Sequence, residues 1–442
     1  MQPDRLIPPY VLYHIPYTLF PFPLIPYFSV QNFRMNQKNL SQLFSLPVIV
    51  AALGYFVDIY DLLLFSIVRR PSLISLGVPE DQLFDKGEFL LMVQMTGLLV
   101  GGLIWGIMGD KKGRLSVLFG SILLYSLANI ANGFAATVSQ YAVLRFIAGV
   151  GLAGELGAGI TLVSETLPTH LRGYGTTIIA TVGLMGAVFA NFISKMFDWQ
   201  IAYFIGGGLG LLLLIARVSV FESGIFLKTK EKSIERGNFF QLFTNRSRFI
   251  KFMGCIFIGL PIWYTIGILI TFSPEFAKAL KIDGTINAGD AVMYSYIGLA
   301  VGDMASGFIS QVVGSRKKIV AVFILLTLAF VLFFLFLPVK TLFFFYLACF
   351  LVGVGIGYWA LFVTIAAEQF GTNLRSTVAT TVPNFIRGTV VPITLAFKFL
   401  RVDVGIIYGA LIIAITTIII AFIALSVIDE TYGRDLNFEE ID

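Results

Sequence analysis

An α-helix needs about 20 apolar residues to cross the roughly 30 Å hydrocarbon core of a bilayer, and this sequence of 442 residues contains twelve such runs. Hydrophobic residues make up 57% of the chain and charged residues 13%, so a soluble core of this size could not hide the apolar surface. We therefore predict an all-α membrane protein with twelve transmembrane helices embedded in a lipid bilayer. The predicted spans cover residues 45–68, 89–109, 115–134, 140–164, 173–197, 199–219, 250–272, 290–313, 319–337, 341–367, 376–400 and 404–428.

The positions of Lys and Arg predict the orientation of these spans. With the N-terminus inside, the cytoplasmic segments hold nineteen of the 31 basic residues, Arg217 among them, and the outer loops hold nine. This bias places both termini in the cytoplasm and predicts a multi-pass protein of the plasma membrane, which is the inner membrane in a Gram-negative cell. The net charge of +5 then reflects topology, and no nucleic-acid partner is expected.

The first 34 residues differ from the rest of the chain. Seven prolines by Pro26 interrupt any helix, and no secretory signal pattern is present. We expect residues 1–34 to be disordered, or not translated, with Met35 as the true start. An interfacial segment rich in proline and aromatic residues is the alternative.

An internal repeat predicts two halves. Glu165 and Arg172 recur 203 residues later as Glu368 and Arg375, with the same spacing between acid and base. We predict two pseudo-symmetric six-helix bundles, residues 35–220 and 249–428, joined by a cytoplasmic linker over 221–248 and followed by an acidic tail over 429–442. Two such bundles facing each other form the architecture of alternating access.

The turn between the second and third predicted spans carries a recognisable motif. It reads Gly-x-x-x-Asp-(Arg/Lys)-x-Gly-Arg, at Gly106, Asp110, Gly113 and Arg114. The pattern resembles the corresponding cytoplasmic loop of the major facilitator superfamily of secondary transporters, and this resemblance implies a gating role for these residues together with Glu165, Arg172, Glu368 and Arg375. An ordinary basic turn is the plain alternative.

Ionisable residues inside the predicted spans are costly, at about 2.5–3.5 kcal/mol each at a helix centre unless compensated. Depth along the helices, at about 1.5 Å per residue, predicts that Arg145 pairs with an acid of the first helix and that Arg387 pairs with an acid of the eighth. Two of the four acids are then left without a base, which favours protonation or the binding of a cation. The ionisable residues are Asp58, Asp61, Arg145, Glu155, Asp303 and Arg387.

Glu155 is the preferred proton carrier because no basic residue is expected at its depth. It lies in a glycine-rich segment that lets another backbone or water approach closely. This segment and the run Gly54–Leu62 resemble the phosphate:proton and metabolite:proton symporter branches, which implies that Asp58 belongs to a proton pathway. We assign proton coupling to Glu155, Asp58, Asp61 and Arg145, with interhelical hydrogen bonding or packing as the alternative role.

The second half offers aromatic, amide and basic groups that suit a ligand. Arg387 favours an organic anion, and a sugar or another polyol is the next candidate. Packing is the alternative role for the aromatic side chains. The candidate substrate-binding residues are Arg387, Asn384, Asp303, Trp359, Tyr264 and Trp263.

Uptake of a small polar metabolite by proton symport is therefore the predicted function. Antiport export is less favoured, because the fifth helix reads Gly183-Leu184-Met185-Gly186-Ala187 without the proline of exporters. A nontransporting sensor or scaffold remains an alternative. No nucleophile–base or metal-ligand set is apparent, so we expect no enzyme activity, no metal and no cofactor, and a monomer that handles a small-molecule substrate and protons.

Overall fold

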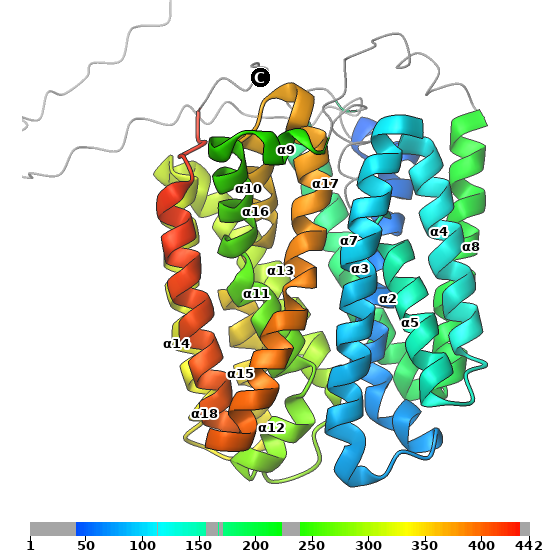
Figure 1. Ribbon diagram of the computed structural model, residues 1–442, viewed down its shortest axis with the longest axis vertical. Coiled ribbons are helices and arrows are strands. Elements are labelled where there is room, and N and C mark those ends of the chain that lie inside the picture. The colour runs from blue at the N-terminus through cyan, green and yellow to red at the C-terminus, as the bar shows by residue number, and fades with distance from the viewer. Residues whose placement is uncertain (1–40, 113, 156–166, 168–170, 223–238, 434–442) are drawn as a thin grey trace, which may run out of the picture.

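The chain is helical throughout the part that the computed structural model describes, residues 41–112, 114–155, 167, 171–222 and 239–433 (Figure 1). Nine helices in this part are long and apolar enough to cross a membrane, and two shorter apolar helices accompany them. The prediction of an all-α membrane protein is confirmed. The principal helices are α2 (Leu46–Ser75), α3 (Leu83–Lys112), α4 (Arg114–Asn132), α5 (Val138–Leu152), α7 (Arg172–Met196), α8 (Trp199–Glu222), α9 (Gln241–Thr244), α10 (Arg246–Ile258), α11 (Leu260–Tyr264), α12 (Ser273–Leu280), α13 (Ala288–Val313), α14 (Arg316–Leu335), α15 (Leu342–Gly355), α16 (Trp359–Glu368), α17 (Thr372–Gly388) and α18 (Val390–Val427).

The predicted runs fall on these helices where the structure describes them, and residues 156–164 of the fourth run lie outside the described part. Three runs are interrupted. The seventh is divided into α10, α11 and a π-helix, η3 (Thr265–Ile270), the tenth into α15 and α16, and the eleventh into α17 and the start of α18. α18 contains two helices that meet at Gly405, whose φ of 81° is readily adopted only by glycine. The predicted N-terminal extension lies outside the described residues, and the predicted domain boundaries stay a prediction.

The helices pack in two groups. α2, α3, α4, α5, α7 and α8 contact one another, as do the helices from α10 to α18, and the groups meet where α2, α3 and α7 touch α13, α17 and α18 (Figure 1). We call these groups the first half and the second half, and their junction the seam. In each half, a glycine allows two helices to pack backbone against backbone. Gly149 of α5 lies against the backbone of α3 at Gly97, and Gly353 of α15 lies against the backbone of α13 at Ser295.

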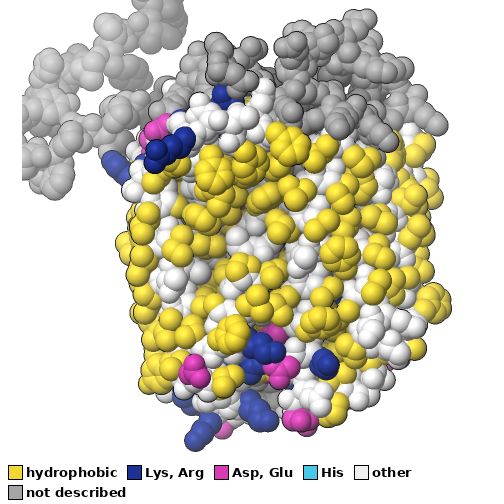
Figure 2. Space-filling view, viewed as in Figure 1, with side chains coloured by type: hydrophobic (Ala, Val, Ile, Leu, Met, Phe, Trp, Pro, Cys, Tyr) yellow, Lys and Arg dark blue, Asp and Glu magenta, His cyan; other side chains and the backbone are white. Residues whose placement is uncertain are grey.

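The lateral surface is apolar and the charges lie toward the ends (Figure 2). Large hydrophobic side chains such as Phe308, Phe399 and Phe343 are 70–74% exposed, as expected where a helix faces lipid instead of water. We call the end of the molecule that carries the α2–α3 turn and α12 the distal end, because it lies opposite the C-terminal end of α18 (Figure 1).

The segment after α18 is tied to α14 by one carboxylate. Glu430 accepts hydrogen bonds from the hydroxyl of Ser315 and from the backbone amides of Arg316 (3.1 Å) and Lys317 (3.2 Å), which begin α14. Partial burial acts to raise the pKa of Glu430, but the hydrogen bonds from Ser315 and from the amides of Tyr432, Arg316 and Lys317 outweigh it and hold that pKa below its ordinary value.

Glu430→Gln should therefore destabilise the protein in a pH-dependent way. A depressed pKa stabilises the fold above the ordinary value of about 4.3, and this contribution is lost as the pH falls through the lower pKa of the folded state. We expect the melting temperature in detergent to drop by about 2 °C at neutral pH, and the difference between variant and wild type to vanish in acid. Asp81→Asn, at an exposed acid, is the control, and a difference that persists unchanged in acid would contradict the assignment.

Candidate transport site

The centre of the seam holds an ion pair between the two halves. Arg387 of α17 lies 3.5 Å from Asp58 of α2, and both side chains are at most 1% exposed. The guanidinium of Arg387 also lies 5.5 Å from the ring of Trp263, whose ring is 6.1 Å from that of Trp359. The prediction that Arg387 pairs with Asp303 is wrong. Arg387 reaches across the seam to the first helix and not to α13 in its own half.

Asp303 forms a hydrogen bond within the second half. Its carboxylate accepts a hydrogen bond of 3.0 Å from the backbone amide of Ala360, in the first turn of α16. The chain between α15 and α16 is interrupted there, where Gly357 lies against Gly302 of α13. Asp303 thus satisfies an amide that the interrupted helix leaves free, and it holds the start of α16, including Trp359, beside the central pair.

Glu155 is paired, contrary to prediction. Arg217 of α8 binds both carboxylate oxygens of Glu155, at 3.0 Å for Oε2, and both side chains are 2% exposed. The prediction that no basic residue lies at the depth of Glu155 is therefore wrong. The pair lies against Gly54 of α2, where any Cβ would collide with both side chains. Arg217, assigned to the cytoplasm from sequence, belongs to the buried core.

Arg145 does not pair with an acid of α2 in the described part of the chain. Its guanidinium donates to the side-chain oxygens of Asn132 (3.2 Å) and Asn129, and it lies 4.5 Å from the ring of Tyr203. The predicted ion pair between Arg145 and an acid of α2 is therefore wrong. The prediction that Arg145 and Asp61 lie at the same depth agrees with their proximity. Asp61 is fully buried, and neither of its oxygens accepts a hydrogen bond from the described residues, although Asn129 and Arg145 lie close by.

The remaining predicted ligand groups mainly join helices. The hydroxyl of Tyr264 donates to the carbonyl of Ala410 (2.7 Å), so Tyr264 ties α11 to α18. The amide of Asn384 donates across the seam to the carbonyl of Ala153 (2.7 Å). Sequence reasoning missed Tyr55, which lies three residues before Asp58 on the same helix and within electrostatic reach of both Asp58 and Arg387.

The structure describes part of the loop motif and of its counterpart in the second half. Gly106 lies on α3 with Thr381 of α17 beside it. In the second half, Glu368 forms an ion pair with Arg316, and Arg375 donates to the carbonyl of Phe370 (3.4 Å). Gly113 and Glu165 lie outside the described residues, as do the side chains of Asp110, Arg114 and Arg172.

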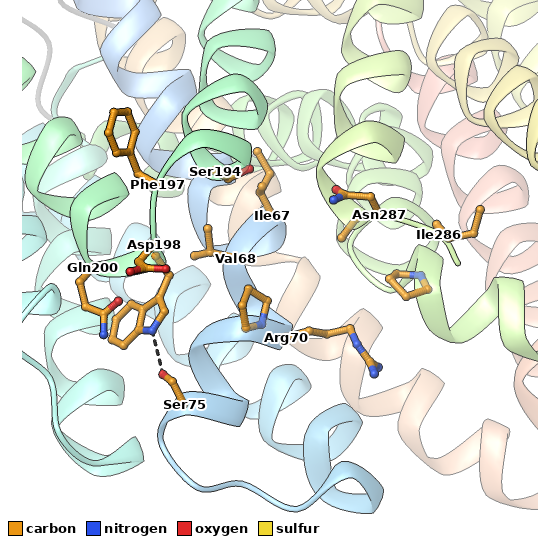
Figure 3. A pocket seen from close by; sticks show the side chains of 14 residues that line it. Ile67, Val68, Arg70, Ser75, Ser194, Phe197, Asp198, Gln200, Ile286 and Asn287 are labelled. Carbon is orange, nitrogen blue, oxygen red and sulfur yellow. Dashed lines mark hydrogen bonds between the residues drawn. The ribbon is translucent and has the colours of Figure 1, made fainter. Parts of the chain in front are cut away.

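A pocket of about 530 Å³ opens at the distal end of the seam (Figure 3). One wall comes from the last turns of α2 and from Phe197, Asp198 and Gln200 at the α7–α8 turn, and Ile286 and Asn287 lie on the opposite side. Ser75 accepts a hydrogen bond from Trp199 (2.7 Å) in the first wall. Ion pairs also join the two halves across the seam toward this end. None of these ion pairs was predicted. Their residues lie more than 90 positions apart, and no local sequence pattern connects them.

Comparison with known proteins supports a transport function. The chain is 29% identical over 162 residues to the niacin transporter of Acinetobacter baylyi, a match that spans only 36% of either chain. It is 24% identical over 294 residues to the sialic acid transporter of Escherichia coli, covering 65% of this chain and 69% of that protein. It is 26% identical over 368 residues to the gentisate transporter of Corynebacterium glutamicum, covering 79% of each. The profile of the Major Facilitator Superfamily matches residues 22–385, most of the sequence, so the chain belongs to this superfamily of membrane transporters and not to an enzyme family.

Proposed function

We propose that this transporter carries a small organic anion with a carboxylate group across the plasma membrane by alternating access, in symport with protons. Arg387 carries the proposal. Its Nε and Nη1 atoms are buried without a hydrogen-bond partner among the described residues, and its one acidic neighbour, Asp58, lies at the long distance of 3.5 Å. A buried guanidinium with free donors suits the bidentate binding of a carboxylate.

The surroundings of Arg387 favour a substrate with an apolar or aromatic body. Trp263 and Trp359 present two indole rings next to the guanidinium, and the indole Nε1 of Trp263 has no hydrogen-bond partner in the described part of the chain. Binding sites for small molecules commonly combine such apolar walls with a few polar groups. Niacin, sialic acid and gentisate, which name the relatives, are all carboxylic acids.

Proton coupling follows from competition for Arg387. When a substrate carboxylate binds the guanidinium, Asp58 loses its base, and a lone buried carboxylate is strongly disfavoured as an anion. Asp58 then takes up a proton, so substrate and proton load together and each favours the binding of the other. Asp61, one turn further along α2 and without a hydrogen bond from the described residues, is the second exchange group in this scheme.

The proposed orientation places both termini in the cytoplasm and the distal end outside. The basic loops favour this arrangement. The ion pairs at the distal end then describe a state that is closed toward the outside. In this scheme Glu155 and Arg217 act as a buried structural pair, and the loop residues Asp110, Arg114, Glu165 and Arg172 keep their proposed gating role.

A reconstituted uptake assay tests the proposal. The purified protein in liposomes should accumulate radiolabelled benzoate, gentisate or niacin when the outside is acidic, above the level in protein-free liposomes, and should not accumulate glucose. Arg387→Gln should abolish accumulation, whereas Lys278→Gln, at an exposed cation of α12, should not. Accumulation under the reversed pH gradient would indicate antiport, and uptake of glucose alone would overturn the organic-anion assignment.

A further inference from the structure

Arginines from both halves cross the seam at the distal end. Arg69 of α2, in the first half, places Nη2 at 2.7 Å from both oxygens of Glu275 in α12 of the second half. Arg401 of α18, in the second half, reaches Glu88 of α3 in the first half, at 3.2 and 3.0 Å. Each half thus supplies an arginine to an acid of the other half.

Each arginine lies over an aromatic ring, and the two rings contact each other. Arg69 lies 4.6 Å from the ring of Phe272, and Arg401 lies 4.2 Å from the ring of Phe84. The rings of Phe84 and Phe272 are 4.9 Å apart and also come from opposite halves. We call these six residues, Arg69, Glu275, Arg401, Glu88, Phe84 and Phe272, the arginine clasp.

The clasp is shielded from water. Arg69 and Glu88 are 0% exposed, Glu275 is 10% exposed and Arg401 is 17% exposed. Charge pairs in such surroundings are screened far less than surface pairs, and removing one partner leaves a costly unpaired charge. On the face shown in Figure 2, acidic and basic side chains gather where α18 meets α3 near the distal end.

Neighbouring charges extend the clasp. Arg70 lies 3.3 Å from Glu275 across the seam and 3.5 Å from the exposed Glu80 in its own half. Arg401 also lies 2.7 Å from Asp85 of the first half. Asp81, an exposed acid of the α2–α3 turn, forms no ion pair with the described residues and provides a contrast.

We propose that the arginine clasp closes the outer entrance of the transporter and that its two ion pairs open as one unit. Separating the halves at this end parts Phe84 from Phe272, and each ring supports one of the two guanidinium groups. Loss of either pair therefore removes the support of the other. Arg69 and Arg401 are positioning residues, which set the population of the outward-open state without contacting the substrate. The proposal rests on the orientation given under the proposed function.

The accessibility of one seam position tests the clasp without any substrate. Ser66 is 4% exposed, and its hydroxyl forms a hydrogen bond of 3.0 Å with Thr271 across the seam, so Ser66→Cys reports opening. The native Cys255 and Cys349 are buried and provide the background. The measurement is the rate of reaction with a membrane-impermeant maleimide in right-side-out and in inverted vesicles.

In the Ser66→Cys background, Glu275→Gln and Glu88→Gln should each raise the labelling rate from the outside by about tenfold, the effect of a small shift in a two-state equilibrium. The double variant should react no faster than the faster single variant, because the pairs open together. Asp81→Asn, which removes an exposed acid of the α2–α3 turn, is the control and should leave the rate unchanged. Phe84→Leu keeps all four charges of the clasp and should also raise the labelling rate. It tests the proposal if a charge variant fails to fold.

Three results would overturn the proposal. Unchanged labelling in both single variants and in Phe84→Leu would show that the clasp does not close the seam. If the increases in labelling rate of the two single variants multiply in the double variant, the two ion pairs open independently. Faster labelling only in inverted vesicles would place the distal end inside the cell and overturn the orientation. Failure of carboxylate uptake with the expected labelling pattern would count against the proposed substrate and not against the clasp.

Discussion

Arg217→Met should abolish uptake and strongly destabilise the protein. The substitution leaves Glu155 as a lone carboxylate that is 2% exposed and packed against Gly54. Removing one partner of a buried ion pair costs about 3–5 kcal/mol, because the remaining charge is neither solvated nor paired. We expect a clear fall in the melting temperature of the purified protein in detergent, together with loss of transport in liposomes.

The double variant Glu155→Gln/Arg217→Met separates the ion pair from a unique role of Glu155. It leaves no lone charge in the core, so much of the lost stability should return. Arg246→Met, at an exposed arginine that begins α10, controls for the loss of an arginine. A melting temperature of Arg217→Met equal to that of wild type would refute the buried pair. Full proton-driven accumulation in the double variant would show that Glu155 is not a proton carrier.

Asp58→Asn should uncouple transport from the proton gradient. The amide cannot take up a proton, and Arg387 loses the acid that competes with the substrate carboxylate. We therefore expect exchange of substrate at equal pH to persist, with a lower KM, while accumulation driven by an acidic exterior is lost. The measurement compares counterflow at equal pH with net uptake under a pH gradient, for the substrate identified in the reconstituted assay.

Asp403→Asn, at an exposed acid of α18, is the matched control and should behave as wild type. Accumulation by Asp58→Asn at the wild-type level would exclude Asp58 as the coupling group and would leave Asp61 as the next candidate. Loss of exchange as well as accumulation would indicate that Asp58 is needed to position Arg387 instead.

The helices could be predicted from sequence because hydropathy and length fix where a span lies along the chain. Depth arguments were less successful, because depth gives the height of a residue but not the direction in which its side chain points. Arg145 does lie near Asp61, but Asn129 and Asn132 take its hydrogen bonds. Arg387 and Asp303 face different partners for the same reason.

Other features of the site were beyond the reach of a single sequence. Arg217 lies near the end of an apolar run, where a basic residue normally marks the membrane surface, so its pairing with Glu155 required knowledge of which helices are neighbours. The arginine clasp joins residues separated by 206 and 313 positions. Nothing in local pattern or spacing connects such residues before the two halves are placed together.

The glycine contacts in the two halves bear on how the molecule can move. At Gly149 and at Gly353 a helix backbone rests directly on its neighbour, with no side chain between them that could change rotamer. Such a contact has little freedom to slide or tilt, since any displacement brings main-chain atoms into collision. We therefore expect the α3–α5 and α13–α15 pairs to move as rigid units. The seam and the interrupted helices, where polar side chains and short turns can exchange partners, are the places where we expect movement.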